Sequence, residues 1–346
     1  MIEEPTPQKT PLSALGEFGL IQRLTEAISL KNTTSVLGVG DDAAVLDFGP
    51  DSEVVVTKDL LLEGVHFDLS YTPLKHLGYK AAAVNLSDLC AMNATPSQLL
   101  VGLAVSNRFP VEALEEIYHG LYLACDRYGV DLVGGDTTSS QTGLMLSVTA
   151  LGHVKRATAV RRSGASATDL LVVTGDLGAA YLGLQVLERE KAAWQANPNL
   201  QPELQGHEYV LERQLKPEPR VDMIRLLRDL DVRPTSLIDV SDGLSSEVLH
   251  LCDASSLGCK LFESKIPMDP TVIRLAEEFG INPITAALNG GEDYELLFTV
   301  PLSDWDKIKG NPNLTAIGHL TESPQRWLVL NSGQEVELTA QGFQHQ

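Results

Sequence analysis

Five short segments place aspartates beside glycine or other small residues. They are G-V-G-D-D-A at 38–43, T-K-D at 57–59, N-L-S-D-L at 85–89, V-G-G-D-T-T at 133–138 and I-D-V-S-D-G-L at 238–244. We expect these aspartates at the ends of apolar strands, along the sheet edge where α/β proteins usually bind ligands. Glycine beside an aspartate lets a ligand approach the backbone closely.

Carboxylates that share a site need cations. At roughly 4 Å each pair repels by a few kcal/mol when the effective dielectric constant is near 20. Oxygen ligands without sets of His or Cys favour Mg²⁺ over zinc or copper, and Mg²⁺ bridges to substrate phosphates. Aspartate beside glycine is also common in ordinary turns, and for any one of these segments a turn is a sufficient explanation. Five segments with the same pattern in one chain favour a site that binds metal and phosphate.

The usual phosphate-binding motifs are missing from the sequence. It contains no G-x-x-x-x-G-K-[ST], no H-R-D with D-F-G and no convincing G-x-G-x-x-G. The S-D-G at 241–243 resembles the metal motif of protein kinases only superficially. These absences exclude a P-loop enzyme and a protein kinase.

Alternating strands and helices must position the aspartates. The first half predicts helices at 17–30, 74–92 and 111–128 and strands at 54–57, 98–105 and 144–154. The second half predicts strands at 169–174, 237–240, 294–300, 315–320 and 327–330, and helices at 177–190, 220–231 and 244–254. Residues 191–207 are polar and bear prolines, which indicates a surface excursion. We predict an α/β (α+β) protein with two domains, residues 1–155 and 156–346.

Composition limits the classes of binding partner and the cellular compartment that we expect. The net charge of −20, from 26 Lys and Arg against 46 Asp and Glu, opposes binding to nucleic acid or to anionic membranes. The sequence shows neither a secretory signal nor a run of about 20 apolar residues. Four cysteines without a C-x-x-C pair are expected to be reduced and buried. We therefore expect a cytoplasmic protein.

Taken in order, the motifs resemble one family closely. They are G-E-F-G-L-I at 16–21, G-V-G-D-D-A-A-V-L at 38–46, E-G-V-H-F at 63–67, K-A-A-A-V-N-L-S-D-L at 80–89, G-G-D-T-T at 134–138, R-S-G-A at 162–165, D-V-S-D-G-L at 239–244 and G-G-E-D-Y-E-L at 290–296. This ordered set is similar to the thiamine-monophosphate kinases, from about residue 16 to the C-terminus.

The resemblance implies a fold and a reaction. The fold is the two-domain one shared with aminoimidazole ribonucleotide synthetase, with the N-terminal domains paired in a homodimer and ATP near their interface. The N-terminal domain binds ATP and Mg²⁺, and the C-terminal domain completes the site. The reaction converts ATP and thiamine monophosphate to ADP and thiamine diphosphate.

The resemblance also assigns roles to residues. It implies these metal ligands: Asp42, Thr57, Asp59, Asp88, Asp136, Asp239 and Asp242. It places Arg162, Ser241, Gly135 and Tyr128 at the nucleotide, and His66, Glu292 and Phe343 at thiamine phosphate. We expect Asp42, Asp136, Arg162 and Asp239 to carry catalysis, by direct in-line transfer and without a general base, because the acceptor is already an anionic phosphate.

Three departures from the family pattern stand out. Lys58 replaces a small hydroxyl residue, and on an alternating strand we expect it to point away from the metal. Asn93 replaces a glycine after a helix, where asparagine tolerates the left-handed conformation. Ser139-Ser140 changes the loop after G-G-D-T-T.

Two alternatives remain open. The first is another ATP-dependent enzyme of the same superfamily, such as aminoimidazole ribonucleotide synthetase, selenophosphate synthetase or a hydrogenase-maturation dehydratase. The reactive N-terminal and C-terminal cysteines of the last two do not occur here. The second is a non-catalytic dimer that binds nucleotide or metal.

Overall fold

The computed structural model describes residues 10–11, 14–39 and 44–340. The chain divides into two compact units. The N-terminal unit comprises Met1–Pro50, Val56–Asn85 and Pro96–Gly152. The C-terminal unit comprises Asp51–Val55, Leu86–Thr95 and His153–Gln346. The prediction of a mixed α/β chain is confirmed, because helices and strands alternate in both units.

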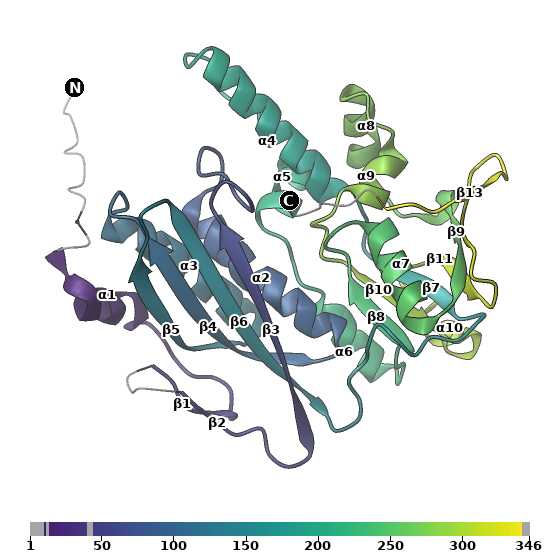
Figure 1. The fold of residues 1–346 in the computed structure, drawn as a ribbon, viewed down its shortest axis with the longest axis horizontal. Coiled ribbons are helices and arrows are strands. Elements are labelled where there is room, and N and C mark those ends of the chain that lie inside the picture. The colour runs from purple at the N-terminus through teal and green to yellow at the C-terminus, as the bar shows by residue number, and fades with distance from the viewer. Residues whose placement is uncertain (1–9, 12–13, 40–43, 341–346) are drawn as a thin grey trace. The chain divides into compact units, whose positions relative to one another are not determined.

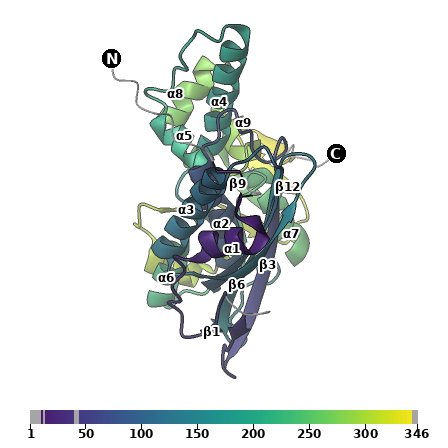
Figure 2. The ribbon, with the colours of Figure 1, turned by 90° about the vertical axis from the view of Figure 1, so that its left-hand side faces the viewer.

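The N-terminal unit is built on a four-stranded sheet with the order β3-β6-β4-β5. Its elements are α1 (Gly16–Thr25), β1 (Ser35–Leu37), β2 (Val45–Leu46), β3 (Ser52–Leu62), α2 (Leu74–Ala91), β4 (Thr95–Val105), α3 (Val111–Tyr128), β5 (Asp131–Ser139) and β6 (Leu144–Lys155). Helices α2 and α3 cover one face of the sheet (Figures 1 and 2). The order places β3 and β5 at opposite edges.

Apolar periodicity explains this packing. Alternate residues of β6 from Leu144 to Val154 are buried, which is the period-2 pattern of a strand with one face on a core. Helix α3 buries Leu114, Ile117 and Leu121 along one stripe. The residue after it, Gly129, caps the helix in the left-handed conformation that favours glycine at this position.

A buried aspartate fixes the chain that leads to the G-V-G-D-D-A segment. The Asp131 carboxylate, at the start of β5, accepts the backbone N–H groups of Lys31 at 2.6 Å and Asn32 at 2.9 Å. The Asn32 side chain donates to the carbonyl oxygens of Ser97 and Gly129. These bonds tie the segment between α1 and β1 to the sheet.

The C-terminal unit is built on a seven-stranded sheet with the order β13-β12-β9-β11-β7-β10-β8. Its strands are β7 (Leu170–Thr174), β8 (Ser236–Asp239), β9 (Gly258–Phe262), β10 (Leu296–Val300), β11 (Leu314–Thr321), β12 (Arg326–Val329) and β13 (Glu335–Glu337). Its helices are α4 (Ala179–Ala196), α5 (Glu208–Leu215), α6 (Val221–Asp229), α7 (Leu244–Ser255), α8 (Pro270–Glu278), α9 (Pro283–Asn289) and α10 (Leu302–Ile308), with a 3-10 turn at Glu263–Lys265.

Two apolar clusters hold the C-terminal unit together. The first joins strands β7, β8 and β10 to α7, through residues such as Leu171, Ile238 and Val248. The second joins α4, α5 and α8, through Leu182, Val210 and Leu275. Figure 2 shows α4, α5 and α8 grouped together. The first cluster thereby holds the end of β8 and the start of β10 beside α7.

Each expected element overlaps an observed one, but some bounds differ, and several observed elements, among them β5, β9, α8, α9 and α10, were not predicted. Helix α1 ends at Thr25, five residues before the predicted end. Strand β3 runs to Leu62, well beyond 54–57. The excursion predicted at 191–207 is wrong in its first part, because α4 continues to Ala196, and α5 after it was not predicted. Within the described residues, no helix is long and apolar enough to cross a membrane.

Helices α2 and α3 cross at a glycine. A Cβ atom added to Gly120 would lie 1.9 Å from the carbonyl oxygen of Lys75 and 2.7 Å from the backbone nitrogen of Tyr79. Gly120→Ala should therefore force the helices apart and lower the free energy of unfolding by about 1–3 kcal/mol. Urea denaturation of the purified variant measures this change.

Gly19 in α1 provides the matched control. A Cβ atom there meets only the Cβ of Leu15, at 3.4 Å. Gly19→Ala should leave stability unchanged or raise it by about 0.5–1 kcal/mol through helix propensity. Equal stability of Gly120→Ala and the wild type would show that the helices do not pack as closely as described.

Candidate functional site

Strand β3 presents Thr57 and Asp59 on one face and Lys58 on the other. The backbone N–H of Asp59 donates to the Asn85 side chain of α2 at 3.1 Å, and Asn85 is fully buried. Lys58 is exposed on the same face as Val56 and Leu60. The expectation that Lys58 points away from Asp59 is therefore confirmed.

Strand β5 carries Gly135 and Asp136 at the opposite edge of the sheet. Gly135 pairs with Val101 and Asp136 with Gly102 of β4, and the Asp136 side chain is exposed. Tyr128 ends α3, and its hydroxyl lies 3.1 Å from that of Tyr79. Asp136 is thus an exposed carboxylate on a fixed strand, suited to binding a cation.

The turn after β3 orients His66. Its Nδ1 accepts the backbone N–H of Leu62 at 3.0 Å, so the proton of the neutral ring lies on Nε2. The side chain is half-buried. This arrangement makes Nε2 a hydrogen-bond donor, which suits a phosphate oxygen or a ring nitrogen of a ligand.

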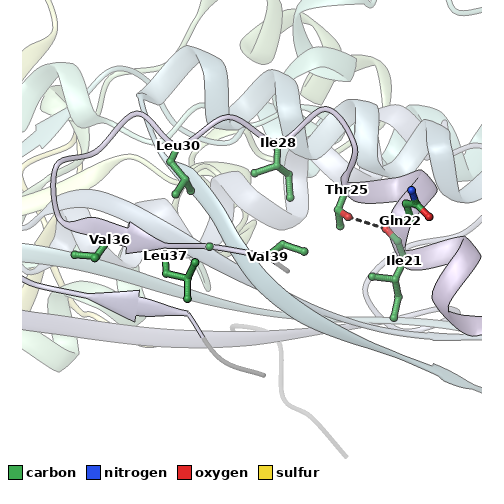
Figure 3. Close-up of a pocket in the computed structure, with 9 residues that line it drawn as sticks. Ile21, Gln22, Thr25, Ile28, Leu30, Val36, Leu37 and Val39 are labelled. Carbon is green, nitrogen blue, oxygen red and sulfur yellow. Dashed lines mark hydrogen bonds between the residues drawn. The ribbon is translucent and has the colours of Figure 1, made fainter. Parts of the chain in front are cut away.

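An apolar pocket of about 510 Å³ lies between α1 and β1 (Figure 3). Ile21, Ile28 and Leu30 line it from α1 and the following segment. Gly38 and Val39, at the start of the G-V-G-D-D-A segment, line its other side. Asp42 itself lies outside the described residues.

In the C-terminal unit, a buried carboxylate lies near a second one. Asp239 ends β8 with 5% of its surface exposed, and the Ser87 hydroxyl donates to it at 2.6 Å. Burial, followed by the neighbouring charge of Asp88, raises the pKa of Asp239 to about 8. A bound divalent cation would reverse this effect. The oxygen-only donors Asp88 and Asp239 therefore fit Mg²⁺.

Glu247 was not predicted from the sequence and contributes to the same region. Its carboxylate accepts the backbone N–H of Asp242 at 3.1 Å, which fixes the S-D-G turn before α7. Burial raises the pKa of Glu247 to about 7, and the hydrogen bond from the Asp242 N–H opposes this rise. An acidic residue in the first turn of a predicted helix was the available signal, because such residues commonly bond to unpaired N–H groups.

The loop that carries Arg162 is attached to β8. The carbonyl oxygen of Arg161 accepts the backbone N–H of Leu237 at 3.0 Å. Arg162 is exposed, and its positive charge opposes the rise in the pKa of Glu247. The guanidinium group is therefore close enough to the S-D-G turn to act on the same ligand.

The S-D-G turn and the G-G-E-D-Y-E-L segment are joined by backbone hydrogen bonds. The N–H of Glu292 donates to the carbonyl oxygen of Ser241 at 2.7 Å, and that of Tyr294 to Val240 at 2.9 Å. A Cβ atom on Gly291 would lie 2.6 Å from the Ser241 carbonyl oxygen, so only glycine permits this approach. The predicted metal and substrate segments thus form one rigid assembly.

The structure brings some of the predicted residues together and separates others. Asp88, Asp239, Ser241, Asp242, Arg162 and Glu292 belong to the C-terminal unit, and Thr57, Asp59, His66, Tyr128, Gly135 and Asp136 to the N-terminal unit. Phe343, like Asp42, falls beyond the part of the chain that the structure describes. Within that part, no three His, Cys, Asp or Glu side chains converge as a metal site.

The expected position of the aspartates at strand ends is wrong for three segments. Among the aspartates of these segments that the structure describes, Asp239 alone ends a strand. Asp59 and Asp136 lie inside β3 and β5, and Asp88 lies inside α2. The reason is that apolar or hydroxyl residues follow Asp59 and Asp136, and these sustain the extended backbone.

Residues 40–154 match the family described as AIR synthase related protein, N-terminal domain. The thiamine-monophosphate kinase of Bacillus subtilis (strain 168) is 33% identical over 96% of this chain and 99% of its own. The chain belongs to the thiamine-monophosphate kinase family.

Solved structures of this family share the fold. Thiamine-monophosphate kinase from Stenotrophomonas maltophilia K279a is 33% identical with a TM-score of 0.78, covering 93% of this chain and 98% of its own. AaThiL, solved in complex with AMPPCP and TMP, is 31% identical with a TM-score of 0.73, covering 99% and 100%. The family and fold expected from the sequence are therefore confirmed.

The buried Asp239 carboxylate yields a test that does not depend on activity. Asp239→Asn removes its charge and preserves its shape. In metal-free protein at pH 7.5, the free energy of unfolding should rise by about 1 kcal/mol, because no carboxylate is buried beside Asp88. Thermal denaturation with Mg²⁺ and ATP should show stabilisation of the wild type but much less of the variant.

Asp229→Asn is the control, because Asp229 is an exposed carboxylate at the end of α6. It should change stability by no more than about 0.5 kcal/mol and leave ligand stabilisation intact. A less stable metal-free Asp239→Asn protein would contradict the repulsion between Asp88 and Asp239.

Proposed function

We propose that this chain phosphorylates thiamine monophosphate to thiamine diphosphate with ATP. The observation that carries the proposal is the rigid assembly of the C-terminal unit. In this assembly the buried Asp239 carboxylate, which lies beside Asp88, is joined to the segment of Glu292, the residue expected to bind the substrate. Family membership over nearly the whole chain supports the same reaction.

Mg²⁺ is the metal proposed for this site. The residues that would hold it are Asp42, Thr57, Asp59, Asp88, Asp136, Asp239 and Asp242. The fit rests on the oxygen-only donors and on the raised pKa of Asp239. When bound, Mg²⁺ neutralises charge on the phosphates of the two substrates.

The remaining residues bind and orient the substrates. Arg162 supplies a fixed positive charge for ATP phosphates beside the S-D-G turn, and Ser241 a hydroxyl. His66 donates a hydrogen bond from Nε2 to thiamine monophosphate, and Phe343 offers an aromatic surface to its rings. The acceptor is an anionic phosphate monoester, so direct in-line transfer needs no base to remove a proton.

We propose that the enzyme is a homodimer that pairs through the N-terminal sheet. On the outer face of β3, Val56, Leu60 and Leu62 are 59%, 51% and 41% exposed. Lys58 lies between Val56 and Leu60 in this row. A row of mostly apolar, exposed side chains on a regular strand is typical of an interface. A second copy, related by a twofold axis, would cover this row with its own.

The sheet order also supports a dimeric site. Asp59 and Asp136 lie on edge strands separated by β6 and β4. Three strand spacings amount to about 14 Å, whereas oxygens on one Mg²⁺ lie within about 4 Å of each other. The two carboxylates of one chain therefore serve different sites, and Asp59 meets Asp136 of the partner where the edges join.

The compartment and domain roles follow the same proposal. The four cysteines are free and buried, which supports a reducing, cytoplasmic location. The net charge of −20 supports small phosphorylated substrates rather than nucleic acid. Residues 1–155 would bind ATP and Mg²⁺ and form the dimer, and residues 156–346 would complete the site.

The reaction is tested with purified protein, ATP, Mg²⁺ and thiamine monophosphate. We expect thiamine diphosphate and ADP in equal amounts, and no product when EDTA removes the metal. Asp136→Asn should lower the rate at least a hundredfold with an unchanged far-UV spectrum, because a ligand on a fixed exposed strand is lost. ATP binding without thiamine diphosphate formation would overturn the proposed reaction.

Subunit complementation tests the dimeric site. Asp59→Asn and Asp136→Asn homodimers should each be inactive. A mixed dimer should regain up to about half of the wild-type rate, because one of its two sites carries both mutations and the other carries none. Mixing after mild dissociation, with size-exclusion chromatography as the check on assembly, measures this. No recovery in verified mixed dimers would mean that each site uses one chain only.

A further inference from the structure

A buried network of charges surrounds the segment that carries Glu292. The Glu295 carboxylate bonds to Arg213 at 2.9 Å and to Arg220 at 2.7 Å, and the Thr174 hydroxyl donates to it at 2.5 Å. Arg220 also binds Asp222 through two nitrogens. Every partner is a side chain of the C-terminal unit, so Glu295 is fixed from α5, α6 and β7 at once.

Asp293 fixes the other side of the same segment. Its two oxygens accept the backbone N–H groups of Gly178 at 2.7 Å and Ala180 at 3.3 Å, at the start of α4. Glu292, just before these anchors, and Tyr294, between them, have φ values of 57° and 52°, in the left-handed region. Strained non-glycine residues persist only where the surroundings hold them, and they cluster at functional sites.

One hydrogen bond from α5 reaches Glu292 itself. The Nε2 of Gln214 donates to Oε2 of Glu292 at 2.7 Å. Gln214 is only 6% exposed and follows Arg213, which is bound to Glu295. The helix thus binds the Glu295 carboxylate through Arg213 and the Glu292 carboxylate through Gln214.

We propose that Gln214 is a positioning residue that fixes the Glu292 carboxylate in the orientation that binds the thiamine portion of the substrate. This inference rests on the proposed function and on Glu292 as a substrate residue. Thiamine carries a cationic thiazolium ring and an aminopyrimidine, and a carboxylate complements both. Gln214 orients that carboxylate with a neutral amide, which adds no positive charge to compete with the substrate.

Gln214→Met tests the hydrogen bond with a side chain of similar size. Loss of one bond to a charged group should raise KM for thiamine monophosphate by about five- to tenfold. KM for ATP, and kcat at saturating substrate, should stay within about twofold. A rise in KM for thiamine monophosphate with no rise in KM for ATP distinguishes a positioning role from a general loss of structure.

Glu212→Gln is the matched control on the same helix. Glu212 is exposed and pairs with Lys216, so its KM values should equal those of the wild type. A second variant, Gln214→Lys, keeps a donor but places an ammonium group against Glu292. It should raise KM for thiamine monophosphate further, and it tests the proposal even where Gln214→Met fails to fold.

A double-mutant cycle shows whether Gln214 acts through Glu292. If it does, Gln214→Met should add nothing to Glu292→Gln in KM for thiamine monophosphate. Additive effects of the two mutations, or an unchanged KM in Gln214→Met, would overturn the inference. The proposed function would still stand if the wild type converted thiamine monophosphate. A wild type without turnover of thiamine monophosphate would instead overturn the function on which the inference rests.

Discussion

Burying a carboxylate beside another is the constraint on which this structure depends. Asp239 is enclosed at the end of β8, with Asp88 close enough to raise its pKa further. A fold does not retain such an arrangement for stability, because desolvation and repulsion both oppose it. The hydroxyl of Ser87 compensates only in part. The proposed binding of Mg²⁺ by the two carboxylates would account for this arrangement, and perturbed carboxyl groups of this kind cluster at functional sites.

The second feature is the way in which this carboxylate is coupled to the substrate segment. Asp239 pairs with Leu296 across β8 and β10, so the residues that follow β8 and precede β10 lie side by side. Backbone bonds from Glu292 and Tyr294 to the turn after β8 then leave little freedom for relative motion. Reacting phosphates must be held in line to within a fraction of an ångström, and a rigid connection between the proposed metal and substrate residues would provide this.

The sequence predicted most of the fold, because apolar periodicity is strong in the buried strands and in α3. It identified the aspartates but placed Asp136 at the end of a strand. The strand in fact continues past Asp136 through hydroxyl residues, which the search for apolar runs did not detect. Asn93 was expected in the left-handed conformation and has a φ of 58°. Glu247 and Gln214 escaped prediction for different reasons. Gln214 acts through Glu292, a residue that only the folded chain brings near. Glu247 bonds to Asp242 five residues before it, and its place in the first turn of a predicted helix was a signal that the sequence analysis did not use.

The separation of Asp59 from Asp136 gives the proposed dimer a chemical reason. A four-stranded sheet ends in two edges whose backbone groups can pair with another chain, and proteins protect or use such edges. Here each edge strand carries one of the predicted metal ligands, and β3 adds exposed apolar side chains. If two copies join these edges, the same contact that buries the apolar face also assembles the metal ligands. Repulsion between the acidic chains, each with a net charge of −20, would then make cation binding and assembly mutually dependent.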